Sequence, residues 1–197
     1  ITQQGRCRDD FGNAFGCDNG TILRYYPLEE RYLRRNPHVV PPLTSVLVPR
    51  DPDANRVFPR SRILARFNEP DAAGRVTSGC GVGLYRDVLL GEEFAGNSFT
   101  CEPVHNLVTR LVLKEDGATF SGARAAEETA SEFLASTDPW FRPVQARTGP
   151  DGALYVVDMA RFVIEHPTWI PEERLAPSKE PSAEKRIAPR ASSARQK

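Results

Sequence analysis

Trp140, Phe141 and Arg142 stand next to one another, just before a segment that reads as a β-hairpin. An arginine is costly to bury, so its place beside two large rings calls for a reason. A guanidinium stacks on aromatic faces and donates paired hydrogen bonds to carboxylates, so this trio suits a planar or anionic ligand. The alternative is an arginine that ties neighbouring strands together through Asp138.

Two acidic positions and one histidine are further candidates. Asp158 ends the second strand of the hairpin, where it can ligate calcium or satisfy nearby backbone N–H groups. Asp9 and Asp10 offer the same choice between calcium and an ordinary surface pair. His105 follows a strand end and is a candidate general base near neutral pH; the alternative is a turn histidine held by hydrogen bonds.

The chain has four cysteines and neither CxxC nor CxxCH spacing, which argues against zinc and covalent haem. An even count without metal spacing indicates disulfides and an oxidising compartment; four buried thiols are the alternative. Cys80 and Cys101 fall in neighbouring antiparallel strands, where opposed Cα atoms come within about 4.5 Å. Cys7 and Cys17 bracket a short loop. We predict the disulfides Cys7–Cys17 and Cys80–Cys101.

Short strands separated by turn residues are expected to position these groups. Asn19-Gly20 predicts a hairpin, and residues 43–75 read as a long ordered loop. Four strands are expected between residues 77 and 124, and the pattern restarts at residue 142. Groups of four antiparallel strands repeating at roughly 40–50 residues are typical of β-propeller blades; a β-sandwich is the alternative.

The composition limits the possible binding partners and indicates where the folded domain ends. The net charge is zero and the pI is about 7, which argues against nucleic acid as a main partner. Neither a targeting segment at Ile1 nor an apolar run of the roughly 18 residues needed to span a membrane is visible. Residues 172–197 are basic and poor in large apolar side chains, so we expect a disordered tail after a domain of residues 1–171.

Several long motifs carry a family resemblance. "RFNEPDAAGRVTSGCGVGLYRD", "EFAGNSFTCEPVHNLV" and "SEFLASTDPWFRPVQARTGPDGALYVVDM" occur in this order. They resemble the C-terminal propeller blades of the membrane-bound dehydrogenase-like proteins of planctomycete-type bacteria, within the soluble glucose/sorbosone dehydrogenase-like quinoprotein group. The resemblance covers about residues 5–171.

This resemblance implies an all-β fold, namely a β-propeller fragment of about three blades. It also implies that the fragment by itself has no enzymatic activity. It implies periplasmic or otherwise extracytoplasmic oxidation of an alcohol or sugar, with hydride transfer to pyrroloquinoline quinone (PQQ) beside calcium. A c-type cytochrome would accept the electrons. Arg142 would clamp the quinone carboxylates, Trp140 would stack on the ring, Asp158 would face the channel and His105 would be the base.

The chain departs from the family pattern at Thr109, where a histidine is frequent, and at Ala160, where an aromatic residue is frequent. Two other functions therefore stay open. One is a non-catalytic propeller that binds carbohydrate or a protein partner. The other is a calcium-dependent hydrolase or lactonase, which needs acidic ligands that converge in the channel.

Overall fold

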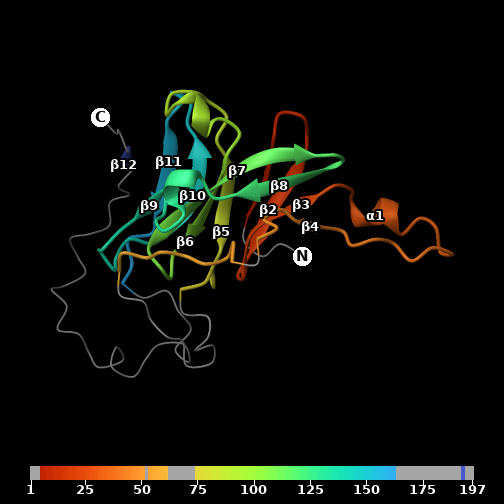
Figure 1. The fold of residues 1–197 in the computed structure, drawn as a ribbon, viewed down its shortest axis with the longest axis horizontal. Helices are drawn as coiled ribbons and strands as arrows, with labels where there is room; N and C mark the ends of the chain where they lie inside the picture. The colour runs from red at the N-terminus through yellow and green to blue at the C-terminus, as the bar shows by residue number, and fades with distance from the viewer. Residues whose placement is uncertain (1–4, 52, 62–73, 163–191, 194–197) are drawn as a thin grey trace, which may run out of the picture.

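The computed structural model describes residues 5–51, 53–61, 74–162 and 192–193, which form three antiparallel sheets (Figure 1). The first sheet has the order β1 (Arg6–Arg8), β2 (Ala14–Asp18), β3 (Thr21–Tyr26), β4 (Val46–Leu47). The second has the order β5 (Cys80–Leu84), β6 (Ser98–Glu102), β7 (Leu107–Asp116), β8 (Thr119–Ala123), with β9 (Leu134–Ala135) also paired to β7. The third has the order β10 (Pro143–Thr148), β11 (Leu154–Asp158), β12 (Ser192–Ser193).

Helical structure in these residues is limited to single turns. They are α1 (Glu30–Leu33) and the 3-10 turns Glu92–Phe94 and Ala126–Glu128. No helix in the described part of the chain is long and apolar enough to cross a membrane. The all-β class expected from the sequence is therefore confirmed, and the strands predicted between residues 77 and 159 are present.

The first hairpin forms where Asn19-Gly20 predicted it, between β2 and β3. The loop predicted at residues 43–75 was expected to bury Val57, Phe58, Ile63, Leu64 and Phe67. Val57 is buried and Phe58 is half-buried, while Ile63, Leu64 and Phe67 lie outside the described residues. In the tail predicted to be disordered, β12 pairs with β11, while residues 172–191 and 194–197 lie outside the described ranges.

The first strands of the three sheets lie beside one another, because β5 contacts both β1 and β10. Two glycines of β5 make the approach to β10 very close. A Cβ atom at Gly81 would lie 2.0 Å from the carbonyl oxygen of Val144, and one at Gly83 would lie 2.1 Å from that of Ala146. Gly81 also has a φ of 57°, which disfavours any other residue. The two sheets can therefore pack only when both positions lack a side chain.

Two apolar clusters fill the space around these strands. The first includes buried Phe15, Ile22, Leu23, Val82 and Leu111. The second includes Tyr85, Phe99, Val108, Ala146 and Leu154. The first cluster thus joins the first and second sheets, and the second joins the second and third sheets. Packing of this kind is the main source of stability in such a fold.

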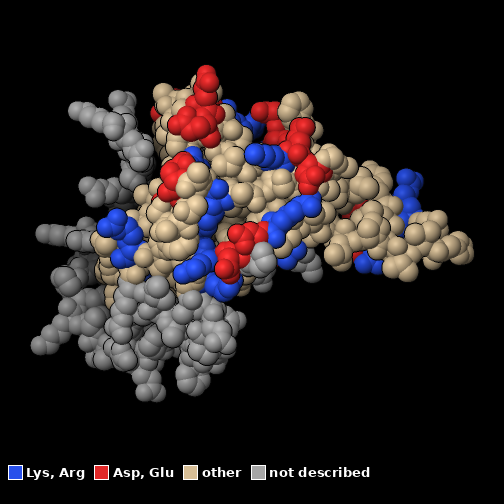
Figure 2. Space-filling model, in the orientation of Figure 1, with Lys and Arg blue, Asp and Glu red and all other residues tan. Residues whose placement is uncertain are grey.

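Charged side chains are mixed in sign over the surface. Figure 2 shows acidic and basic residues interspersed on the face it presents, in line with the zero net charge. Several are paired, as in Arg24 with Asp18 at 2.9 Å and Arg50 with Asp116. The segment between β3 and β4, which carries α1, projects from the sheets at the right of Figure 1.

Replacing Gly81 by alanine should lower the free energy of unfolding by roughly 2–5 kcal/mol, because the new methyl group meets a backbone carbonyl and the φ is unfavourable. Gly20→Ala is the matched control, since a Cβ atom added there would have no neighbouring atom within 4 Å, and it should change stability by less than about 0.5 kcal/mol. Urea unfolding of the purified protein measures both. Equal effects at the two positions would contradict the packing described above.

Candidate functional site

Three of the residues singled out from the sequence gather around the turn between β6 and β7. The guanidinium of Arg142 lies against this turn, residues 103–106, and His105 is part of it. Asp158 accepts a hydrogen bond of 2.7 Å from the backbone N–H of Arg142. The sequence interpretation therefore selected neighbouring residues, although the contacts that join them are contacts within the protein.

Arg142 is 5% exposed and donates hydrogen bonds to backbone carbonyl oxygens on two segments. Its Nη1 donates to Pro103 at 2.5 Å and to Val104 at 3.3 Å. Its Nε donates to Arg161 at 3.0 Å and its Nη2 to Phe162 at 2.6 Å. The side chain thus joins the β6–β7 turn to the chain after β11. It links the second and third sheets through hydrogen bonds to backbone carbonyl groups.

Trp140 and Asp158 have similar local roles. The ring of Trp140 packs on that of Phe162, with 5.9 Å between centroids. Asp158 Oδ1 accepts from the N–H groups of Arg142 and of Ala160, the latter at 2.9 Å. A strand-end aspartate that satisfies backbone donors was one of the two interpretations of this residue, and these contacts match it.

A buried carboxylate accompanies His105. The carboxylate oxygen Oε1 of Glu102 lies 2.9 Å from His105 Nδ1, with the two residues 0% and 3% exposed. Glu102 also accepts from the backbone N–H of Ser78 at 2.8 Å and from its hydroxyl at 2.7 Å. The carboxylate therefore fixes the ring, with Nε2 as the acceptor of the neutral form. Nε2 is buried and has no hydrogen-bond partner among the described residues.

Glu102 and Asn106 were not selected from the sequence. Asn106 has a φ of 59° and its amide donates to Phe141 at 2.6 Å, which fastens the turn to the segment before β10. The spacing of three between Glu102 and His105, at the end of a strand, was the available signal for the dyad. For Asn106 no signal existed, because its partner is 35 residues away.

The acidic residues considered for calcium are held by other groups. Asp9 Oδ1 accepts from the backbone N–H groups of Phe11 at 3.0 Å and Asn13 at 2.8 Å, and Asp10 pairs with Arg86. Within the described ranges, no group of three or more histidine, cysteine, aspartate or glutamate side chains is placed to hold a metal ion.

None of the four cysteines forms a disulfide in the structure. Cys80 stands directly opposite Cys101 in the β5–β6 register, as the predicted disulfide requires, whereas Cys7 is opposite Phe15. Both disulfides remain predictions. Burial raises the pKa of Cys7 and of Cys80 to about 12 and that of Cys17 to about 11.

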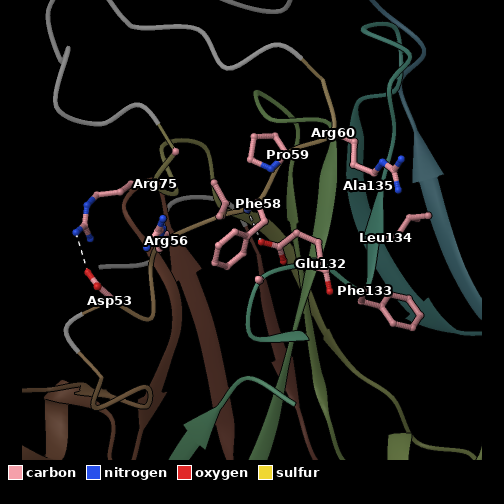
Figure 3. Close-up of a pocket in the computed structure, with 14 residues that line it drawn as sticks. Asp53, Arg56, Phe58, Pro59, Arg60, Arg75, Glu132, Phe133, Leu134 and Ala135 are labelled. Carbon is pink, nitrogen blue, oxygen red and sulfur yellow. Dashed lines mark hydrogen bonds and ion pairs between the residues drawn. The ribbon is translucent and has the colours of Figure 1, made fainter. Parts of the chain in front are cut away.

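A pocket of about 860 Å³ lies beside β9 (Figure 3). Its walls are the loop after β4 and the segment that leads into β9. Both walls contact the turn, because Ser61 Oγ donates to the His105 carbonyl at 3.3 Å and Ala135 pairs with Leu107. The lining is Asp53, Arg56, Val57, Phe58, Pro59, Arg60, Gly74, Arg75, Ala130, Ser131, Glu132, Phe133, Leu134 and Ala135.

Figure 3 shows how the charged groups of the pocket lie. Asp53 pairs with Arg75 at 3.0 Å. The side chain of Glu132 is fully buried and accepts from Arg124 and from the backbone N–H of Phe58. Arg56 and Arg60 stand on opposite sides of Glu132 in this view. The sequence predicted a long ordered loop at residues 43–75, but none of these arginines was selected from it.

Arg142→Ala should lower the free energy of unfolding by about 3–5 kcal/mol, because it leaves buried carbonyl groups without donors. Arg50→Ala is the control, since its pair with Asp116 is exposed and is worth about 0–1 kcal/mol. Urea unfolding followed by circular dichroism compares the two variants. A loss below about 1 kcal/mol at Arg142 would show that the carbonyl contacts do not stabilise the fold.

In the reduced, folded protein, the buried thiols should react with iodoacetamide at pH 9 far more slowly than in urea, because their folded pKa values lie near 11–12. The raised pKa also means that stability falls as the pH rises from about 9 towards 12, since only the unfolded thiols ionise there. Mass spectrometry of labelled peptides measures the rates.

The predicted disulfides are tested separately, by a peptide map under non-reducing conditions of protein from an oxidising compartment. A map that joins Cys17 to Cys80, or that shows four free thiols, would contradict them.

Comparison with known proteins identifies a family. Residues 1–191 match the family described as Domain of unknown function (DUF7133), and the chain belongs to this family. Neither a curated protein nor a solved structure matches the chain.

Proposed function

We propose that this DUF7133-family chain is part of a non-catalytic β-propeller, and that the pocket beside β9 binds carbohydrate. The observation that carries the non-catalytic assignment is Arg142. Its guanidinium donates to carbonyl groups of the chain at Nε, Nη1 and Nη2. An arginine used in this way holds two sheets together instead of recognising a ligand.

The propeller architecture is supported by the contacts among the first strands. Each sheet is an antiparallel meander, and β5 contacts both β1 and β10. Arg147 of β10 donates to the carbonyl of Val82 on β5 at 2.5 Å and to that of Arg6 on β1 at 3.3 Å. In a propeller, the first strands of successive blades surround the central axis in this manner.

A quinone with calcium does not fit the described residues. The donors of Arg142 face carbonyl groups, Trp140 packs on Phe162, and Asp158 accepts from two backbone N–H groups. Metal-ligating side chains also do not converge in the described part of the chain. For these reasons the proposal assigns no reaction step to PQQ or calcium.

Carbohydrate is favoured by the pocket itself. Its volume lies in the range of roughly 300–1,000 Å³ that is usual for small-molecule sites. The guanidinium groups of Arg56 and Arg60 line it together with apolar side chains such as Pro59 and Leu134. A sugar presents the same mixture, with hydroxyl groups at its edges and C–H groups on its faces.

The dehydrogenase implied by the family resemblance is the second candidate, because one observation favours it. His105 is oriented by Glu102, and its buried Nε2 has no partner in the described residues. A histidine held by a carboxylate in this way can accept a proton from a substrate hydroxyl as hydride leaves the adjacent carbon. The electron acceptor would then have to be bound by residues outside the described ranges.

Calorimetry of the intact protein separates the two candidates. Titration with PQQ plus calcium should show no binding, while titration with a panel of oligosaccharides should show saturable binding. Tight quinone binding with oxidation of an alcohol or sugar that is lost in His105→Gln, but retained in His38→Gln, would instead establish the dehydrogenase. His38 is exposed in the segment between β3 and β4, which makes it a suitable control.

A further inference from the structure

We infer that copies of this chain associate head to tail, and that a projecting arm of one copy docks in a second pocket of the next. The arm consists of residues 27–45, which connect β3 to β4 and extend away from the sheets (Figure 1). This contact between copies does not involve the pocket beside β9, so it is independent of the proposed carbohydrate binding.

Large apolar side chains are exposed along the arm. Val40 is 92% exposed and Leu43 is 86% exposed, and Leu28, Tyr32 and Val39 are exposed as well. Figure 2 shows mostly uncharged surface over the arm on the face it presents. Exposed apolar side chains that gather in one place mark contact sites for another protein. The arm is therefore a docking element.

Two prolines hold this part of the arm extended. The ring of a proline fixes its own φ at about −65°, and the residue before a proline is kept out of helical conformations. Pro41 and Pro42 thus restrict Val40 as well as themselves. Residues 34–45, all of them described, form neither helix nor strand. An extended proline-containing segment loses little conformational entropy on binding, and such segments dock against aromatic rings.

A second pocket, of about 370 Å³, offers an aromatic lining to such a segment. It is formed by residues outside the arm, on the β1–β2 turn, at the end of β5 and on the β7–β8 hairpin. Phe11 on the turn is 90% exposed, and Val88 is also exposed. Phe120 and Leu113 of the β7–β8 hairpin are half-buried. The pocket and its rim are thus the concave counterpart of the apolar arm.

The pocket carries an excess of negative charge. Its lining contains four acids and one arginine. Asp10 pairs with that arginine, Arg86. Glu115 stands opposite Phe120 in the β7–β8 register, is exposed and forms no ion pair with any described residue. A positively charged occupant is therefore favoured over a neutral or acidic one.

The arm supplies a positive charge. Arg31 pairs with Glu29 and Arg34 pairs with Glu30, both within the arm. Arg35 is exposed and forms no ion pair with any described residue. An arm of one copy therefore brings apolar side chains and a positive charge to a pocket of opposite charge. Because one arm covers less than the roughly 1,600 Å² of a standard interface, we expect association in the micromolar range.

Sedimentation velocity of the intact protein at low salt tests the association. The average mass should rise above that of the monomer as the concentration passes through the micromolar range. Val40→Asp in the arm and Phe11→Ser in the pocket should each weaken association at least about tenfold, and Leu43→Asp should act as Val40→Asp does. Val157→Asp is the matched control, because Val157 is an exposed valine on β11 outside both surfaces.

Mixing the two variants tests whether the arm enters the pocket. Val40→Asp retains the pocket and Phe11→Ser retains the arm, so an equimolar mixture should form a one-to-one complex although neither variant associates with itself. Arg35→Glu and Glu115→Arg should each weaken association about threefold, as expected for an exposed ion pair. Both changes in one chain should restore it.

Each other outcome overturns a stated part of the inference. A monomer at every concentration up to millimolar refutes association. Association that persists in both Val40→Asp and Phe11→Ser, or a mixture of the two that stays monomeric, refutes the docking of arm in pocket. Failure of the double charge reversal to restore affinity overturns the pairing of Arg35 with Glu115. Thermal unfolding of each variant confirms that lost association is not lost folding.

Discussion

The close approach of β5 to β10 is the constraint on which the arrangement of the sheets depends. Where Gly81 and Gly83 face Val144 and Ala146, the two strands leave no room for a Cβ atom. Side chains at these positions would push the third sheet away from the second. The shared core around Phe99 and the contacts of Arg147 with the other two sheets would then be lost. Two residues with no side chain thus determine how the third sheet packs on the second.

The same packing gives Arg142 its role. Since β10 lies against β5, the start of β10 comes beside the β6–β7 turn, and the guanidinium reaches the carbonyl groups of Pro103 and Val104. A buried arginine needs partners for its donors, and backbone carbonyls supply them without a second charge. The turn fixed in this way also holds His105 against Glu102, and the His105 carbonyl accepts a hydrogen bond from Ser61 in the loop that lines the pocket. Stability and the candidate binding site are consequently joined at one turn.

Local patterns in the sequence were enough to predict the strands and several of their turns. Alternating and glycine-rich segments predicted β5 to β8, β10 and β11, because strand periodicity and turn residues act over a few neighbouring positions. The opposition of Cys80 and Cys101 also followed from strand order alone. The trio Trp140, Phe141 and Arg142 was correctly recognised as unusual. Glu102 and His105 are three residues apart, so their pairing could have been predicted from the same short segment.

Only the tertiary structure decided what those unusual residues contact. A guanidinium has the same chemistry beside a carboxylate ligand and beside a carbonyl group, and the choice for Arg142 depended on segments 19 to 39 residues away. The pocket likewise joins a loop near residue 56 to a segment near residue 132, which no local pattern connects. The sequence by itself determined the strands and the chemical groups available, because these depend on neighbouring residues. Packing between distant segments determined which arginine supports the fold and which ones line the pocket.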